Sequence, residues 1–226
     1  MITSRDNEKL KLVRKLHDRR WRDKLGLFAA EGEDLVDAGL DSGLEPVELL
    51  VAGNNVSPEL LAEVSSLAHA PRVVGVFRRA DLPRGSRDVV LALWHVADPG
   101  NVGTLLRSAD AFGASVALSP GSADPTGPKA LRASMGAVFR VPTCAFDEAP
   151  GRRIALVPRG GTPLPELELG RPVTFVVGAE REGLPREVLE RCDERASIPQ
   201  RGDAESLNVA MAATVALYEL ARRSRS

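Results

Sequence analysis

The sequence predicts an α/β protein whose C-terminal part is built on a mostly parallel sheet. Short apolar runs alternate with helical patterns, as where the run at 89–94 precedes a helix expected over 101–113. The runs are continuously apolar, which is typical of strands buried on both faces of a parallel sheet. Glycine and asparagine recur where strands should end, and in such sheets ligands bind beyond the carboxyl ends of the strands. We therefore expect one composite site at that edge.

The first 80 residues predict a small α/β unit. A helix is expected over 7–24, with Leu12, Val13 and Leu16 on its apolar face. A strand and a helix share 25–43, and the remaining elements are strands at 47–53 and 72–79 and a helix over 57–70 that Ser57 would cap. The polar segment 81–88 predicts a linker, which divides the chain into domains 1–80 and 89–226.

Beyond the linker, strands are expected at 89–94, 115–120, 153–158 and 173–178, with a helix or loop over 129–139. A long helix is expected from about Ser206 to Arg223. Its side chains Leu207, Met211, Val215 and Tyr218 recur at helical spacing and are expected to form its buried stripe.

Composition describes an ordinary globular protein, with 43% hydrophobic and 27% charged residues. No apolar run approaches the roughly 20 residues of a membrane span, and the charged N-terminus lacks a secretory pattern. The two cysteines, Cys144 and Cys192, have no metal-ligand spacing, so we expect neither a metal site nor disulfides, and a cytoplasmic protein.

Positive charge is concentrated at the N-terminus although the net charge is −1. Residues 1–24 hold nine basic and four acidic side chains. Such clustering is expected of a phosphate-binding surface. A solvated helix face is the alternative, and this segment alone does not decide between the two.

The segment 98–114 predicts a capped helix with one arginine outside its core face. Asn101 follows Pro99 and Gly100 and is expected to be the N-cap. Leu105, Ala109 and Phe112 should face the core, whereas Arg107 points toward solvent or a ligand. An exposed arginine on an ordinary helix is the simpler interpretation of this segment.

Two later segments carry further candidates. The strand at 173–178 ends in Gly178, with Glu180 and Gly183 following, and neither a dinucleotide fingerprint nor a P-loop is present. In the second segment Ser206 is expected to be the N-cap of the last helix. Asn208 is then unusual just inside that helix, because it competes with the backbone there, which makes it a functional candidate.

Taken together, these segments resemble the SpoU (TrmH-like) branch of the SPOUT superfamily, which are S-adenosylmethionine-dependent RNA ribose 2′-O-methyltransferases. The pattern N-x-G-x-x-x-R, the strand ending G-x-E-x-x-G and the pattern I-P-x-x-G-x-x-x-S-L-N-V are all present, in that order. They are carried by Asn101, Gly103 and Arg107; by Gly178, Glu180 and Gly183; and by Ile198, Pro199, Gly202, Ser206, Leu207, Asn208 and Val209. Arg132, Ser134, Gly136 and Ala137 match an intermediate R-x-S-x-G-A stretch, and Gln200 stands where methionine is common.

The N-terminal segment is similar to the family's substrate-binding domain, which resembles ribosomal protein L30e. Trp21, Arg22, Phe28, Glu31 and Gly32 carry this similarity. It favours ribosomal RNA, with the large subunit preferred, over tRNA as the substrate. A tRNA 2′-O-methyltransferase and a non-catalytic RNA-binding module of the same fold remain the alternatives.

The resemblance implies a deep trefoil knot near the C-terminus, a homodimer formed through the knotted domain, and S-adenosylmethionine as methyl donor without a metal. Arg107 would clamp a phosphate near the target ribose, because deprotonating a guanidinium at neutral pH costs roughly 7 kcal/mol. The other implied catalytic residues are Asn101, Glu180, Ser206 and Asn208. The cofactor would contact Gly178, Gly183, Ile198, Gly202 and Leu207. RNA would contact Lys11, Lys15, Arg19, Arg22 and Arg132.

Overall fold

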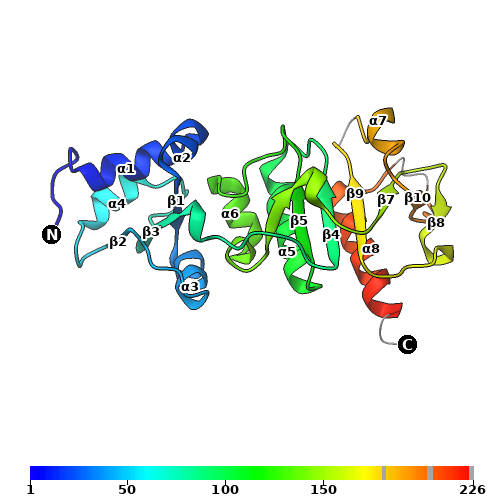
Figure 1. Ribbon diagram of the computed structural model, residues 1–226. Helices are drawn as coiled ribbons and strands as arrows, with labels where there is room; N and C mark the ends of the chain where they lie inside the picture. The colour runs from blue at the N-terminus through cyan, green and yellow to red at the C-terminus, as the bar shows by residue number, and fades with distance from the viewer. Residues whose placement is uncertain (180–181, 203–205, 224–226) are drawn as a thin grey trace.

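Two β-sheets organise the protein and lie end to end along its long axis (Figure 1). The computed structural model describes residues 1–179, 182–202 and 206–223, so the candidate Glu180 lies outside the described residues. The N-terminal sheet has three antiparallel strands in the order β1-β3-β2. The larger sheet has seven strands in the order β6-β5-β4-β9-β7-β10-β8, and its paired strands are parallel, as predicted.

The N-terminal part contains two short helices where one was predicted. Its elements are α1 (Glu8–Leu16), α2 (Arg19–Leu25), β1 (Leu27–Glu31), α3 (Glu33–Asp41), β2 (Glu48–Val51), α4 (Pro58–Val64), β3 (Val73–Arg78) and η1 (Arg79–Asp81). The prediction of a continuous helix over 7–24 is wrong because Asp18 has an extended backbone and accepts a hydrogen bond from the backbone N–H of Arg20. Asp18 therefore starts α2 as its N-cap.

The helix α4 also ends earlier than the predicted residue 70, and the buried carboxylate of Glu31 explains why. This carboxylate accepts hydrogen bonds from the hydroxyls of Ser65 and Ser66 and from the backbone N–H of Ser66. Burial alone would raise the pKa of Glu31, but these bonds and a contact with His17 outweigh it and lower the pKa. A charged carboxylate therefore holds the chain away from helical geometry after α4.

The larger sheet carries the remaining elements. They are β4 (Val89–Leu93), α5 (Pro99–Ala111), β5 (Ser115–Leu118), α6 (Pro128–Ser134), η2 (Ala137–Phe139), β6 (Thr143–Ala145), η3 (Phe146–Glu148), β7 (Arg152–Leu156), β8 (Thr162–Pro163), η4 (Leu164–Glu166), β9 (Val173–Val177), α7 (Arg186–Leu189), β10 (Glu194–Ser197) and α8 (Val209–Arg223). The strands β6, β8 and β10 were not predicted because they are short and lack an apolar run.

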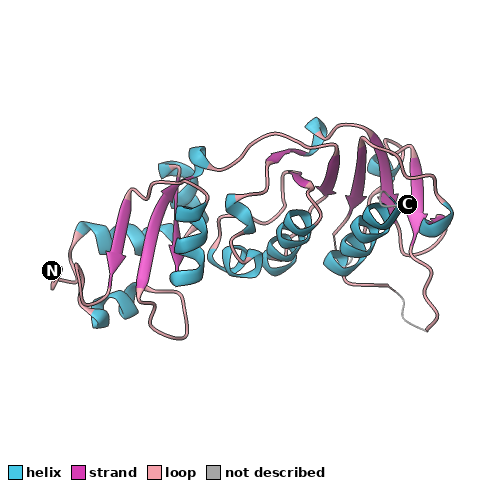
Figure 2. Cartoon of the chain, turned by 90° about the horizontal axis from the view of Figure 1, so that it is seen from below, coloured by secondary structure: helices cyan, strands magenta, loops and turns pink. Residues whose placement is uncertain are grey.

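Strands of this sheet are buried on both faces. Leu91 and Leu93 of β4 belong to the main core, whereas Val90 and Ala92 belong to a second cluster on the other face. Figure 2 shows long helices lying along one face of the sheet, and α5 packs against both α6 and α8. Among the described helices, none combines the length and apolarity required to cross a membrane.

The two parts share a core and a buried ion cluster. Phe28 and Phe77 of the small sheet pack against Phe139, with ring centroids 5.9 and 5.4 Å apart. Beside them, Arg22 donates through Nε to Asp124 at 2.8 Å, and Arg79 donates to the same carboxylate at 3.1 Å. The side chain of Arg22 is only 5% exposed, so its prediction as an RNA contact is wrong. Its guanidinium joins the two parts of the protein instead.

Candidate active site

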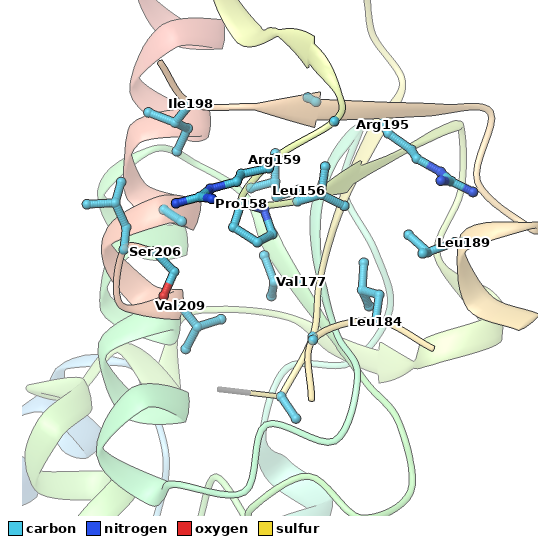
Figure 3. Close-up of a pocket in the computed structure, with 18 of the residues that line it drawn as sticks. Leu156, Pro158, Arg159, Val177, Leu184, Leu189, Arg195, Ile198, Ser206 and Val209 are labelled. Atoms are coloured by element: carbon cyan, nitrogen blue, oxygen red, sulfur yellow. The ribbon is translucent and has the colours of Figure 1, made fainter. Parts of the chain in front are cut away.

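A cavity of about 640 Å³ opens where the strands β7 and β9 end and the helix α8 begins (Figure 3). Six of the predicted site residues line it: Gly178, Gly183, Ile198, Ser206, Leu207 and Asn208. They lie up to 30 positions apart in the sequence, and the parallel sheet brings them to one edge. The location agrees with the rule that ligands bind beyond the carboxyl ends of parallel strands.

Gly178 is required by a close approach of two backbone segments. A Cβ atom at this position would lie 2.3 Å from the carbonyl carbon of Gly183. The chain folds back here, with the N–H of Gly183 donating to the carbonyl of Ala179 at 2.9 Å. Gly183 has a φ of +66°, which glycine adopts without strain. Both glycines therefore shape the cavity rim.

The cap of α8 is Asn208 and not Ser206. Its Oδ1 accepts hydrogen bonds from the backbone N–H groups of Ala210 at 2.9 Å and Met211 at 3.4 Å. Its Nδ2 donates to Oδ1 of Asn101 at 3.1 Å. The amide thus occupies a favoured N-cap position and also reaches α5, so its presence near the helix start is not a local conflict.

The N-cap of α5 is Asp98 and not Asn101, so this prediction is wrong by three residues. The Asp98 carboxylate accepts from the backbone N–H of Asn101 at 3.0 Å and from the ammonium of Lys129 at 2.7 Å. These two bonds, that of Lys129 first, lower the pKa of Asp98. A proline at the first helical position favours this start, and the side chain of Asn101 accepts a hydrogen bond from Asn208.

Arg107 lies on the outer side of α5. It is exposed, its side chain makes no hydrogen bond or ion pair to the described residues, and it is not among the residues that line the cavity. Within the described part of one chain, the arginine of the first motif is therefore not brought to the cavity that holds the second and third motifs.

The apolar stripe of α8 is exposed, contrary to the prediction. Leu207, Met211, Val215 and Tyr218 are 36%, 63%, 39% and 57% exposed. The buried face consists of Val209, Ala210, Ala213, Ala216, Leu217 and Leu220. The α5–α8 contact includes a hydrogen bond between the hydroxyls of Ser108 and Thr214 at 2.6 Å. Small alanines allow this close packing, and the large apolar side chains face outward.

Further lining residues come from the end of β7, and the sequence interpretation missed them. They include Leu156, Val157, Pro158, Arg159 and Gly160. Figure 3 shows Arg159 extending toward the wall that contains Ile198 and Ser206. An apolar strand that is soon followed by Arg-Gly-Gly was the available signal, by the same strand-end rule that found Gly178. Gly202, in contrast, does not line the cavity.

The remaining RNA candidates are at the surface. Lys11 pairs with Glu8 at 3.0 Å, and Arg19 lies 3.7 Å from Asp23. The ammonium groups of Lys15 and Lys24 lie 5.2 and 5.0 Å from the centre of the Trp21 ring. Arg132 donates to the Ser66 hydroxyl at 3.2 Å. Among the residues that the structure describes, no group of three or more His, Cys, Asp or Glu side chains could hold a metal ion.

Comparison with known proteins identifies both parts of the chain. The SpoU rRNA Methylase family matches residues 88–218. The chain belongs to this SpoU family. Residues 7–80 match the MRM3-like substrate binding domain.

Relatives of the SpoU family match this chain over nearly its whole length. The 23S rRNA (guanosine(2553)-2′-O)-methyltransferase RlmP of Bacillus subtilis is 30% identical, with 97% of this chain and 98% of RlmP covered. A Synechocystis protein named as an uncharacterized tRNA/rRNA methyltransferase is 33% identical, with 98% of this chain and 93% of that protein covered.

Solved structures of RNA methyltransferases share the fold over nearly the whole chain. The AdoMet-bound rRNA methyltransferase of Sinorhizobium meliloti superposes with a TM-score of 0.86 at 30% identity, covering 99% of this chain and 97% of that one. The methyltransferase AviRb of Streptomyces viridochromogenes, in complex with AdoMet, also has a TM-score of 0.86 at 27% identity. The match covers 97% of this chain and 99% of AviRb. This chain is therefore an S-adenosylmethionine-dependent RNA methyltransferase of the SpoU family, as the motifs predicted.

Proposed function

We propose that this protein methylates one ribose 2′-hydroxyl of ribosomal RNA, with the large subunit preferred, and that it acts in the cytoplasm. The observation that carries this proposal is the hydrogen bond between Asn101 and Asn208, which joins the first and third motifs at the rim of the cavity. The full-length similarity to RlmP, whose name specifies a 2′-O-methyltransferase of 23S rRNA, supports the choice of substrate.

The cavity has the size and chemistry that the cofactor requires. Its volume of about 640 Å³ lies within the range of small-molecule sites, roughly 300 to 1,000 Å³. Gly178 and Gly183 present backbone at the cavity rim, and Ile198 and Leu207 provide apolar walls for an adenosine ring. Arg159 offers a cation for the cofactor carboxylate. When bound, S-adenosylmethionine supplies a methyl group on a positively charged sulfur.

The side chains around the cavity would position the RNA and its hydroxyl proton. We assign to Arg107 a clamp on the phosphate beside the target ribose, where its planar guanidinium binds two oxygens at once and stabilises the developing alkoxide. Asn101 and Asn208 orient each other through their amides. Ser206 lines the cavity and would hydrogen-bond the target ribose or relay its hydroxyl proton to solvent. Glu180 would order the adjoining loop.

Arg107 would reach its substrate across a homodimer interface. It projects from the outer side of α5, and the exposed apolar residues Met211, Val215 and Tyr218 lie on the neighbouring helix α8. An exposed apolar patch of this kind marks a protein interface. A second copy placed on this surface would cover the stripe and bring Arg107 toward the cavity of its partner.

The knot that the resemblance implies remains part of the proposal. The strand order inserts β9 between β4 and β7, and β10 then pairs on the far side of β7. This order is compatible with a C-terminal segment that threads through an earlier loop. The basic surface of α1 and α2, which presents Lys11, Lys15 and Arg19, would hold RNA outside the cavity.

The test is methyl transfer from labelled S-adenosylmethionine to ribosomal RNA from cells that lack the protein, with the position mapped as a 2′-O-methyl stop. We expect one discrete site in large-subunit RNA, and no transfer by Gly178→Ala, whose Cβ would collide with Gly183. Transfer to tRNA alone would overturn the substrate assignment. RNA binding without cofactor binding or transfer would support the non-catalytic alternative.

A further inference from the structure

His95 has an unusual backbone conformation at the sheet edge that carries the cavity. Its φ is +51°, a value that, among the described non-glycine residues, is approached only by Met135 with +50°. Glycine adopts this region freely, and histidine does so at some cost. Strained residues of this kind persist where the surroundings hold them, and they are concentrated at functional sites. The conformation by itself identifies no role.

The imidazole ring of His95 is fixed without using its nitrogen atoms. It stacks on Trp94 with ring centroids 4.7 Å apart and an angle of 9° between the planes. A Cβ atom at Gly121 would lie 3.2 to 3.5 Å from Cδ2, Nε2 and Cγ of the ring, so this glycine backbone packs closely over it. The backbone N–H of His95 donates to the Ser119 hydroxyl at 2.9 Å.

The ring is nevertheless exposed, and its nitrogens make no hydrogen bond or ion pair to the described residues. A polar side chain that is held rigid and left unpaired loses little conformational freedom when it binds a partner.

The location of His95 relates it to the RNA substrate. Trp94 donates its backbone N–H to the carbonyl of Val177, which lines the cavity. Three positions beyond His95, Asp98 starts the helix that presents Asn101. Figure 1 shows β4, which leads into His95, in the interior of the large sheet between β5 and β9. The histidine is therefore next to the cavity, on the edge where RNA must approach.

We propose that the His95 imidazole forms a hydrogen bond with a nucleotide that flanks the methylated ribose, and so positions the RNA. Single-stranded RNA is recognised by hydrogen bonds to splayed nucleotides and by stacking on aromatic rings, and imidazole takes part in both. Trp94 and Gly121 are positioning residues that keep the ring in place. This inference rests on the proposed function, since it requires an RNA substrate at the cavity.

The test compares His95→Gly with wild type, because glycine removes the imidazole and relieves the backbone conformation. With saturating cofactor, we expect the KM for ribosomal RNA to rise about tenfold, the loss expected for one hydrogen bond. The kcat should change less than twofold. The Kd for S-adenosylmethionine should not rise, and the Tm should not fall. His95→Asn, which tolerates the same φ and retains hydrogen-bonding atoms, should recover part of the KM.

Met135→Gly is the matched control, since it makes the same backbone change at the end of α6 and should leave KM unchanged. A wild-type KM in His95→Gly would overturn the inference, as would an equal loss of cofactor affinity or a fall in kcat alone. If the wild-type protein methylates no RNA, the proposed function fails instead. The two failures are therefore distinguishable.

Discussion

The Nδ2 atom of Asn208 donates a hydrogen bond to Oδ1 of Asn101 at 3.1 Å, and this bond joins the start of α8 to the first turn of α5. The residues are 107 positions apart, yet each lies at a helix start beside the cavity. Asn208 also caps α8, so one side chain fixes the helix and a neighbouring amide at once. This double role explains an asparagine where a serine cap would suffice for the helix alone.

We predict that Asn101 and Asn208 are coupled in catalysis. Asn101→Ala and Asn208→Ala should each lower kcat/KM. The increase in activation free energy of the double variant should be smaller than the sum of the two single increases. The expected coupling is about 0.5 to 3 kcal/mol, typical of residues in direct contact. Strict additivity would contradict a functional link. Asn208→Ser keeps a helix cap, but the shorter serine side chain cannot reach Asn101. This variant should therefore keep the wild-type Tm and lose activity.

Arg107 should act on the cavity of the partner subunit. When Arg107→Ala and Gly178→Ala chains are co-expressed, a mixed dimer would hold one complete site, with Gly178 from one chain and Arg107 from the other. Random pairing should then restore about one quarter of wild-type activity, although each variant alone is inactive. Methyl transfer by the purified mixture measures this. No restoration in verified mixed dimers would mean that Arg107 serves its own chain.

The exposed stripe on α8 should hold the dimer together. Met211→Glu places a charge on a side chain that is 63% exposed in the single chain, and burying that charge against a partner is costly. We expect a monomer by light scattering and loss of methyl transfer. Met135→Glu, at an apolar side chain that is 53% exposed outside α8, should leave the dimer intact. A dimeric Met211→Glu protein would place the interface elsewhere.

Much of the site could be predicted because its residues follow strand ends. Gly178 and Gly183 follow β9, and a run of apolar residues ending in glycine marks such a position in sequence. Arg159 follows the same rule at the end of β7 and was missed only because no motif drew attention to it. The parallel direction of the strands in the large sheet could also be predicted, because continuously apolar strands are typical of parallel sheets.

The errors have a common physical origin in tertiary contacts that periodicity does not encode. The spacing of Met211 and Val215 predicts an apolar stripe but not which stripe faces the core, and the alanines on the other side allow closer packing. Arg22 looked like one member of a basic surface, yet Asp124, 102 residues away, draws it inside. Charge clustering in sequence cannot reveal such a distant partner.

RNA binding should depend on salt through the surface of α1 and α2. Neutralising Lys11, Lys15 and Arg19 together to glutamine should lower the slope of log Kd against log salt by about 2 to 3, if each contacts one phosphate. Arg191→Gln, which removes a charge that is paired with Asp147 on another face, should change the slope little. Filter binding over a salt series measures both. An unchanged slope would remove this surface from the RNA-binding site.

The buried pair of Arg22 and Asp124 should make the protein sensitive to acid. Burial alone would raise the pKa of Asp124, but hydrogen bonds from Thr126 and Arg22 and the charge of Arg79 outweigh it and lower the pKa. A carboxylate whose pKa is lower in the folded state stabilises that state above its unfolded pKa. This contribution is lost as the pH falls from about 4 through the folded pKa.

Asp124→Asn leaves two guanidinium groups without their shared anion, so we expect the free energy of unfolding at pH 7 to fall by about 3 to 5 kcal/mol. Urea denaturation should show this difference shrinking below pH 4, because the wild-type carboxylate then becomes neutral as well. Asp147→Asn, at a carboxylate that is 71% exposed, should cost at most about 1 kcal/mol and serves as the control. If Asp124→Asn matched this control, the junction between the two sheets would depend on the Phe28, Phe77 and Phe139 packing alone.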